Sequence, residues 1–205
     1  MIDQNKYGPW AFVAAGSMGY ELAGKDDRDA MTSTDDKTTT SIEDRLELLE
    51  QRVRLLDDHN QIMRLLYSYG PSVDSGLSTI ASGLWIEDGV YDVDTGLMDG
   101  RSEIETMVQT DPHQGFLKQG CGHVMSPARI TVSGDNAVAV CHTQLILRQP
   151  DNDGYQVSRV TANRWELIRT SAGWKVAIRT SRLLDGRDEP RAILASAFSP
   201  TAQDW

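Results

Sequence analysis

Three polar residues in this chain could act together in proton transfer. Asp74 follows a helix-like segment, His123 begins a strand-like segment, and Arg179 lies within the last strand-like segment. An imidazole can take up a proton, a carboxylate can orient that imidazole, and a guanidinium can stabilise a developing anion. These residue types predict a buried proton-abstraction site, provided that the fold brings the three side chains together.

Each of the three residues also has an ordinary structural explanation. Asp74 precedes Ser75 and Gly76 and could be a turn residue. His123 could be a core histidine with satisfied hydrogen bonds, and Arg179 could be a solvated strand residue. The distance between Asp74 and His123 distinguishes these explanations from the proton-abstraction site.

Composition narrows the class of protein. The 205 residues, of which 40% are hydrophobic, suffice for one domain with a substantial core. The net charge of −10 argues against a nucleic-acid partner, because neutralising phosphates requires a basic surface. Cys121 and Cys141 are too few for a disulfide framework and form no C-x-x-C pattern. Without an apolar stretch of ~18 residues or a signal core, the chain is expected to be soluble and cytoplasmic, with no membrane partner.

Residues 1–40 differ from the rest of the chain. The first 25 resemble the start of a short-chain dehydrogenase, where a strand leads into a glycine-rich dinucleotide loop. However, Glu21 stands where the third glycine of that loop should be, and residues 26–40 are polar and unpatterned. We therefore expect residues 1–40 to form an extension outside the core of a domain spanning residues 41–205.

The core domain should begin with a helix. Ser41 and Asp44 resemble a capping box with Asp in place of Glu. Apolar residues then recur at alternating spacings of four and three, at Ile42, Leu46, Leu49, Val53 and Leu56. This stripe predicts a helix that packs on the domain's own sheet, with a dimer contact as the alternative.

Helical periodicity gives way to strand periodicity in the second half of the chain. Further helices are predicted over residues 58–69, ending at Gly70-Pro71, over 77–86, and from Arg101 to Val108. Strands are predicted at residues 89–94, 123–125, 129–132, 137–147, 155–168 and 174–178. Turns separate the last four strands, as in an antiparallel meander, so the chain has an α+β arrangement.

The order of the motifs resembles the SnoaL-like family of the nuclear transport factor 2-like superfamily. The motifs are Tyr67-Ser-Tyr with Val73-Asp74, residues 84–92, residues 100–104, Gly122-His123, and residues 163–167 with 173–176. The resemblance covers roughly residues 45–185. It implies a cone-like α+β barrel, in which helices pack on a curved, mainly antiparallel sheet.

Within this family the pattern is most similar to those of scytalone dehydratase and hexachlorocyclohexane dehydrochlorinase, which are lyases. The resemblance implies that His123 is the base, Asp74 its partner and Arg179 the anion-stabilising residue. It implies a cofactor-independent lyase of the dehydratase or dehydrohalogenase type, or a related isomerase, acting on a hydrophobic ring-containing small molecule. The alternative is a non-catalytic small-molecule-binding or assembly module, like the small subunit of ring-hydroxylating dioxygenases.

Other residues are candidates for the walls of the substrate pocket, although each could instead serve core packing. These are Tyr67, Trp85, Tyr91, His142, Asn163 and Trp165. His59 and His113 stand in polar surroundings and are expected to be exposed. The absence of HxH and HxxxE spacing, and of a phosphate-binding loop in the core domain, predicts a site without metal or cofactor.

The chain is also expected to form a homo-oligomer, either a dimer or a trimer. The open face of the predicted sheet would otherwise leave apolar positions of residues 137–147 and 155–168 in water.

Overall fold

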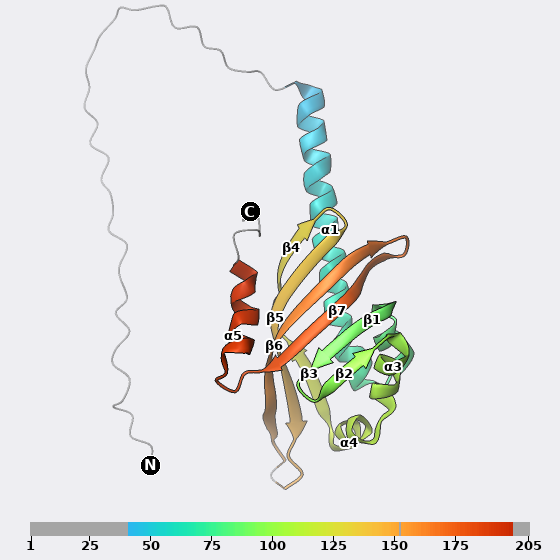
Figure 1. Cartoon of the computed structure of the whole chain (residues 1–205), viewed down its shortest axis with the longest axis vertical. Helices are drawn as coiled ribbons and strands as arrows, with labels where there is room; N and C mark the ends of the chain where they lie inside the picture. Colours follow the sequence, from blue (N-terminus) through green and yellow to red (C-terminus); the bar gives the residue numbers. More distant parts are fainter. Residues whose placement is uncertain (1–40, 152, 199–205) are drawn as a thin grey trace, which may run out of the picture. The chain divides into compact units, whose positions relative to one another are not determined.

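The computed structural model describes residues 41–151 and 153–198, so the predicted extension over residues 1–40 lies outside the described part. The helices are α1 (Ile42–Asp74), α2 (Ser78–Ser82), α3 (Arg101–Gln109), α4 (Asp111–Gln119) and α5 (Asp188–Ala195), followed by a 3-10 turn, η1 (Ser196–Phe198) (Figure 1). The strands are β1 (Trp85–Val93), β2 (Gly96–Asp99), β3 (Cys121–Met125), β4 (Arg129–Ser133), β5 (Asn136–Arg148), β6 (Tyr155–Thr170) and β7 (Gly173–Leu183).

The strands of the described part form one curved, unclosed sheet. Its order is β2-β1-β7-β6-β5-β3, and β4 also pairs with β5. β1 and β7 are parallel, and the other pairs are antiparallel. This arrangement confirms the predicted α+β architecture with a mainly antiparallel sheet.

The core lies between the helical layer of α1–α3 and one face of the sheet. Ile62, Leu66 and Val73 of α1 are fully buried, as are Trp85 of β1 and Trp165 of β6. On the opposite face, α5 contacts β5, β6 and β7. None of the described helices has the length and apolar content needed to cross a bilayer.

Helix α1 is longer than the sequence predicted. It begins with the expected capping box, in which Asp44 N donates to Ser41 Oγ and Ser41 N to Asp44 Oδ2, both at 3.0 Å. The predicted break at Gly70-Pro71 is wrong, because the helix continues to Asp74 and the Ser75 N–H donates to the Pro71 carbonyl at 3.1 Å.

Gly70 allows α1 to approach β3 closely. A β-carbon at Gly70 would lie 2.3 Å from the carbonyl oxygen of His123, closer than any such contact in a folded protein. The glycine therefore lets the helix backbone rest directly on the strand, while the exposed Pro71 faces away from the core.

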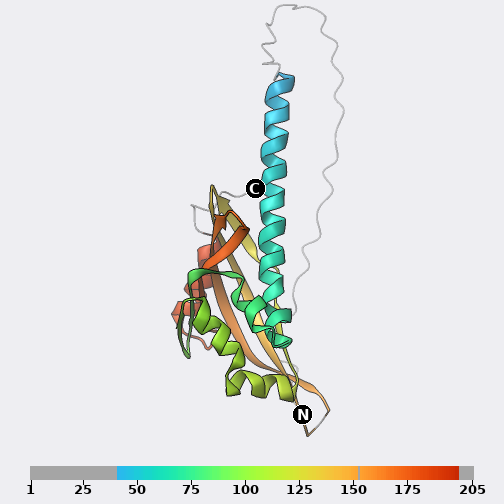
Figure 2. The same ribbon diagram turned by 90° about the vertical axis from the view of Figure 1, so that its right-hand side faces the viewer.

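The predicted packing of the apolar stripe on the sheet is also wrong. We call Ile42, Leu46, Leu49, Val53 and Leu56 the outer stripe; their side chains are between 56% and 81% exposed. Figure 2 shows the reason, since the first half of α1 extends past the end of the sheet. Elsewhere, β2 and α4 were not predicted, and the helix expected over residues 77–86 covers only Ser78–Ser82 because Trp85 begins β1.

A charged cluster joins α1 to the sheet. The Asp58 carboxylate accepts two hydrogen bonds from Arg169 of β6, at 2.6 and 2.8 Å, and one from Trp174 Nε1 at 3.0 Å. The Arg169 guanidinium also lies over the Trp174 ring, 4.4 Å from its centre. The hydrogen bonds from Arg169 outweigh the effect of burial and lower the pKa of Asp58 below its ordinary value of 3.8.

We predict that Asp58→Asn lowers the free energy of unfolding by about 2 kcal/mol, because charge-assisted hydrogen bonds in the interior are lost. An aspartate with a lowered pKa in the folded state stabilises the protein above its unfolded pKa, and this contribution disappears as the pH falls through the folded pKa. The difference in the free energy of unfolding between the wild type and Asp58→Asn should therefore disappear below pH 3.8. Urea unfolding at several pH values measures this. Asp135→Asn, which alters an 80% exposed partner of Arg169, is the control and should change stability little.

We also predict that Gly70→Ala destabilises the fold by about 1–3 kcal/mol, since its methyl group would press on the His123 backbone. Thermal unfolding followed by circular dichroism measures the loss. Gly122→Ala is the matched control beside the same histidine, because nothing lies within 4 Å of its β-carbon. Equal stability of the two variants would contradict the close approach of α1 to β3.

Candidate active site

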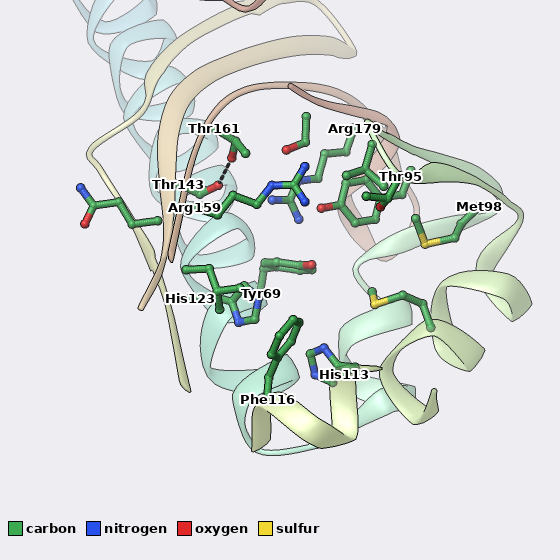
Figure 3. A pocket seen from close by; sticks show the side chains of 16 residues that line it. Tyr69, Thr95, Met98, His113, Phe116, His123, Thr143, Arg159, Thr161 and Arg179 are labelled. Carbon is green, nitrogen blue, oxygen red and sulfur yellow. Dashed lines mark hydrogen bonds between the residues drawn. The ribbon is translucent and has the colours of Figure 1, made fainter. Parts of the chain in front are cut away.

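A cavity of about 180 Å³ opens between α1, α3–α4 and the inner face of the sheet. Figure 3 shows His113, Phe116 and His123 at one end and Thr143, Thr161, Arg159 and Arg179 at the other, with Tyr69 between them. The remaining walls are largely apolar, with Tyr91, Val93, Met98, Met107 and Leu145 among their residues.

Asp74 and His123 form a hydrogen-bonded dyad. The Nδ1 atom of His123 lies 2.6 Å from Asp74 Oδ1, and the backbone N–H of His123 donates to Asp74 Oδ2 at 2.7 Å. An ionised carboxylate can only accept, so Nδ1 carries the proton in this bond. Within the described part of the chain, Nε2 of His123 has no hydrogen-bond partner, and the residue lines the cavity. The dyad therefore leaves one ring nitrogen free to accept a proton from a bound molecule.

The electrostatics keep Asp74 ionised. Partial burial alone would raise the pKa of Asp74, but the hydrogen bonds from the ring and backbone of His123 outweigh it and lower the pKa below its ordinary value. The two side chains are only 22% and 21% exposed, so the interaction is only partly screened by water.

Cys121 adds a third polar group beside the Asp74–His123 dyad. Its thiol donates to Asp74 Oδ1 at 3.5 Å, so Asp74, Cys121 and His123 present three potential metal ligands within 4.8 Å. The sequence did not predict this grouping. Burial first, and then the charge of Asp74, raise the pKa of Cys121 to about 11, so the thiol is protonated at neutral pH. Metals bind the thiolate, whereas here the thiol is protonated and Cys121 and His123 both donate hydrogen bonds to Asp74. These three groups therefore fit proton transfer better than metal coordination.

His113 supports His123 from the side. The two rings stack with their centres 5.9 Å apart, and His113 Nε2 donates to the carbonyl of Val73 at 2.9 Å. His113 is buried, so the prediction that it is exposed is wrong. The prediction that His59 is exposed is also wrong, because this residue is half-buried on α1. His113 is thus fixed to the last turn of α1, and its ring packs against the ring of His123.

Arg179 is a buried cation surrounded by aromatic rings. Its guanidinium carbon lies 4.1 Å from the ring centres of Tyr69 and Trp165 and 4.5 Å from that of Tyr91. Its Nε and Nη2 atoms donate to Asn163 Oδ1 at 3.0 and 2.9 Å. Within the described residues, Nη1 has no partner although it is buried. Buried polar groups are normally satisfied, so the unpaired Nη1 marks a position for a ligand atom.

Asn163 fixes the orientation of Arg179. Its amide nitrogen donates to Thr143 Oγ1 at 2.8 Å and to Thr161 Oγ1 at 2.9 Å, which directs its carbonyl oxygen toward the guanidinium. The two threonine hydroxyls lie 2.7 Å apart. A neutral amide holds the arginine in place without neutralising its charge.

The structure corrects several of the predicted pocket walls. Tyr91 lines the cavity, whereas Asn163 and Trp165 lie behind Arg179 and hold it. His142 is exposed, because Cys141 and Thr143 occupy the inner face of β5 and strand alternation directs His142 outward. Tyr67 is 41% exposed on the outer side of α1, and Trp85 is fully buried in the core. These last three residues do not line the cavity.

Sequence reasoning missed several residues of the cavity. Thr161 could have been found, since it shares a strand face with Asn163 and Trp165 at spacings of two. His113 and Phe116 lie on α4, which was not predicted. Arg159 lines the cavity and also pairs with Asp94 at 3.2 Å, a contact that sequence spacing does not indicate.

Helices covering one face of a curved sheet, with polar groups directed into the enclosed cavity, define an NTF2-like protein. Residues 54–180 match the SnoaL-like domain family, and the chain belongs to this family. The family includes polyketide cyclases and isomerases. A search of proteins with curated functions returned no significant match.

Solved structures support this assignment. An NTF2-like protein with a cystatin-like fold from Novosphingobium aromaticivorans is 37% identical, with 76% of this chain and 98% of that chain covered and a TM-score of 0.70. Rv3472, a protein of unknown function from Mycobacterium tuberculosis, is 20% identical, with 74% and 88% covered and a TM-score of 0.58. A protein from Catenulispora acidiphila in complex with S-DNPA is 16% identical, with 61% and 92% covered and a TM-score of 0.53. The last two likenesses show the fold alone.

We predict that Cys121 reacts slowly with iodoacetamide at neutral pH, because its pKa of about 11 leaves little thiolate. Asp74→Asn removes a negative charge beside the sulfur and should speed the reaction. Peptide mass spectrometry distinguishes Cys121 from the buried Cys141 and follows both rates. Asp111→Asn, which alters an exposed carboxylate on α4, should leave the rate unchanged. Rapid labelling of Cys121 in the wild type would contradict the described environment of Asp74.

Proposed function

We propose that the chain is a cofactor-independent lyase of the dehydratase or dehydrohalogenase type, or a related isomerase, acting on a hydrophobic ring-containing small molecule. The observation that carries this proposal is the 2.6 Å hydrogen bond between His123 Nδ1 and Asp74 Oδ1 beside a cavity. A histidine that donates through one nitrogen to a carboxylate can accept a proton at the other nitrogen.

In the proposed reaction, Nε2 of His123 takes a proton from a carbon atom of the substrate. The electron pair of the broken C–H bond then forms a double bond or an enolate within the substrate. Asp74 stabilises the resulting imidazolium, because it is ionised and bonded to Nδ1. In a dehydration, the leaving hydroxyl group takes this proton from the His123 imidazolium and departs as water, which regenerates the base. In a dehydrohalogenation, the halide departs as an anion and the imidazolium releases its proton to solvent.

Arg179 would stabilise the negative charge that develops in this step. Its Nη1 group is buried without a partner in the described part of the chain, and Asn163 provides hydrogen bonds without a compensating charge. An oxyanion or a departing halide would satisfy this donor at the moment when charge develops.

The cavity limits the size of the proposed substrate. Its volume of about 180 Å³ is below that of typical drug-sized ligand pockets, which begin at about 300 Å³, and close to that of a 150 Å³ cavity able to hold benzene. A compact molecule with one ring and an acidic C–H bond fits this space. The aromatic and methionine side chains of the walls favour an apolar body.

The proposal predicts that His123→Ala lowers the rate roughly a hundredfold or more, since the base is lost. Asp74→Asn should also be severe, and Arg179→Lys damaging, because an ammonium lacks the planar fork. The contribution of Asp74 to the rate should be lost only in acid, as the pH falls through the lowered pKa of its carboxyl group. His142→Ala is the matched control. This histidine is exposed on β5, so its replacement should leave the rate unchanged.

The measurement is deuterium uptake and product formation in D2O, followed by mass spectrometry over a panel of cyclic ketones and of β-hydroxy and β-chloro ring compounds. A chelator should leave both unchanged if no metal takes part. Tight binding of a panel compound to the wild type, without exchange or turnover, would instead support the non-catalytic binding module.

We also propose that the chain forms a homo-oligomer. In the described part of the chain, the outer stripe of α1 presents the most exposed apolar side chains on any one helix. A contact there would leave the cavity accessible, because the dyad lies at the opposite end of the helix.

A further inference from the structure

The outer stripe of α1 faces away from the domain that carries it. At about 100° per residue, the centre of the outer stripe lies roughly 140° around the helix from Ile62, Leu66 and Val73, which pack on the sheet. These three residues are fully buried, whereas every residue of the outer stripe is at least 56% exposed. The domain's own sheet therefore cannot cover the stripe without a rotation of α1 that would expose the core.

The stripe has the heptad pattern of a two-stranded coiled coil. The first core position of each heptad, a, is taken by Leu46, Val53 and the exposed Asn60, and the second, d, by Ile42, Leu49 and Leu56. A β-branched residue at a with leucine at d favours two strands, and an asparagine at a fixes the register of a parallel pair. Val53, Leu49, Leu56 and Asn60 agree with this rule.

Charges on the two sides of the stripe add an independent argument. One flank, position e, is acidic and consists of Glu43, Glu50 and Asp57. The other flank, position g, is basic and consists of Arg45, Arg52 and His59. In a parallel, in-register pair, each g residue faces the e residue five positions further along the other helix. Arg45 would then face Glu50, and Arg52 would face Asp57.

The antiparallel arrangement lacks this complementarity, because it places g beside g and e beside e. Basic residues would then meet basic residues and acidic ones would meet acidic ones. Within its own helix, Glu50 contacts Arg54 at 3.6 Å and Asp57 accepts a hydrogen bond from Gln61. Such contacts between exposed side chains are weak, so both carboxylates remain able to pair with arginines of a second helix.

We infer that two copies of this chain associate through a parallel, in-register coiled coil formed by residues 42–60 of α1. The two barrel domains would lie on opposite sides of the helix pair, because each stripe faces away from its own sheet. The inference specifies the surface of the proposed homo-oligomer and is independent of the chemistry proposed for the cavity.

The molar mass of the full chain tests the surface. Sedimentation equilibrium of the wild type at micromolar concentration should give twice the 22.7 kDa chain mass. Leu49→Glu should halve that value, because a charge would be buried in the seam. Leu48→Glu is the matched control on the same helical turn, since Leu48 is 48% exposed but lies outside the seam, and it should remain dimeric. A monomeric or trimeric wild type, or a dimer that survives Leu49→Glu, would overturn the inference.

Two further variants test the orientation. Arg45→Glu with Arg52→Glu should weaken the dimer, and adding Glu50→Arg and Asp57→Arg to the same chain should restore it. Ile42→Cys should form an intermolecular disulfide on mild oxidation, because position 42 meets itself only in a parallel pair. The wild type, oxidised in parallel, controls for Cys121 and Cys141. Absence of both the charge rescue and the cross-link would rule out the parallel register.

Discussion

The site depends on the contact between the end of α1 and strand β3. Because Gly70 has no side chain, the helix backbone can lie against the carbonyl of His123, and one further turn brings Asp74 to the strand. There, a single carboxylate accepts hydrogen bonds from both the ring and the backbone of His123. Ring tautomer, ring orientation and backbone position are thus set by one helix terminus. Asp58 fixes the same helix to the sheet four turns earlier through Arg169 and Trp174.

Arg179 shows how the fold holds a positive charge in its interior. Taking a guanidinium out of water is costly, and a carboxylate partner would be the usual compensation. Here the compensation comes from the faces of Tyr69, Trp165 and Tyr91 and from the carbonyl oxygen of Asn163. Aromatic faces stabilise a cation without carrying a formal charge, so the positive potential in the cavity is retained. The cavity therefore presents a positive charge that no carboxylate in contact with Arg179 neutralises within the described residues.

The sequence predicted the elements whose patterns are long and regular. Strands β5 to β7, helix α3 and the capping box at Ser41 all carry strong local signals, and they occur where expected. Gly70-Pro71 was misread because local propensity favours a break, whereas the tertiary contact with His123 requires the glycine within a helix. The helix that carries His113 was missed because proline and glycine interrupt its pattern.

The candidate site was predictable in residue type but not in geometry. Asn163 could be singled out as a polar residue in an apolar strand, yet its role became visible only through Arg179 and the threonines beside it. Strand alternation placed His142 and Cys141 on opposite faces, but alternation alone does not say which face is inside. That choice is made by the packing of α1 and of the core against the sheet, which depends on residues distant in sequence.

Helix α1 combines two surfaces whose requirements differ along its length. Its second half is held by burial against the sheet. Among the residues that the structure describes, its first half is stabilised only by a capping box and exposed side-chain pairs. Short helical segments in water are marginal, because nucleation costs more than a few hydrogen bonds return. Burial of the outer stripe against a second helix would supply the missing tertiary contact. It would do so without altering the dyad, because the rigid second half of α1 separates the two regions and its position is fixed by the core.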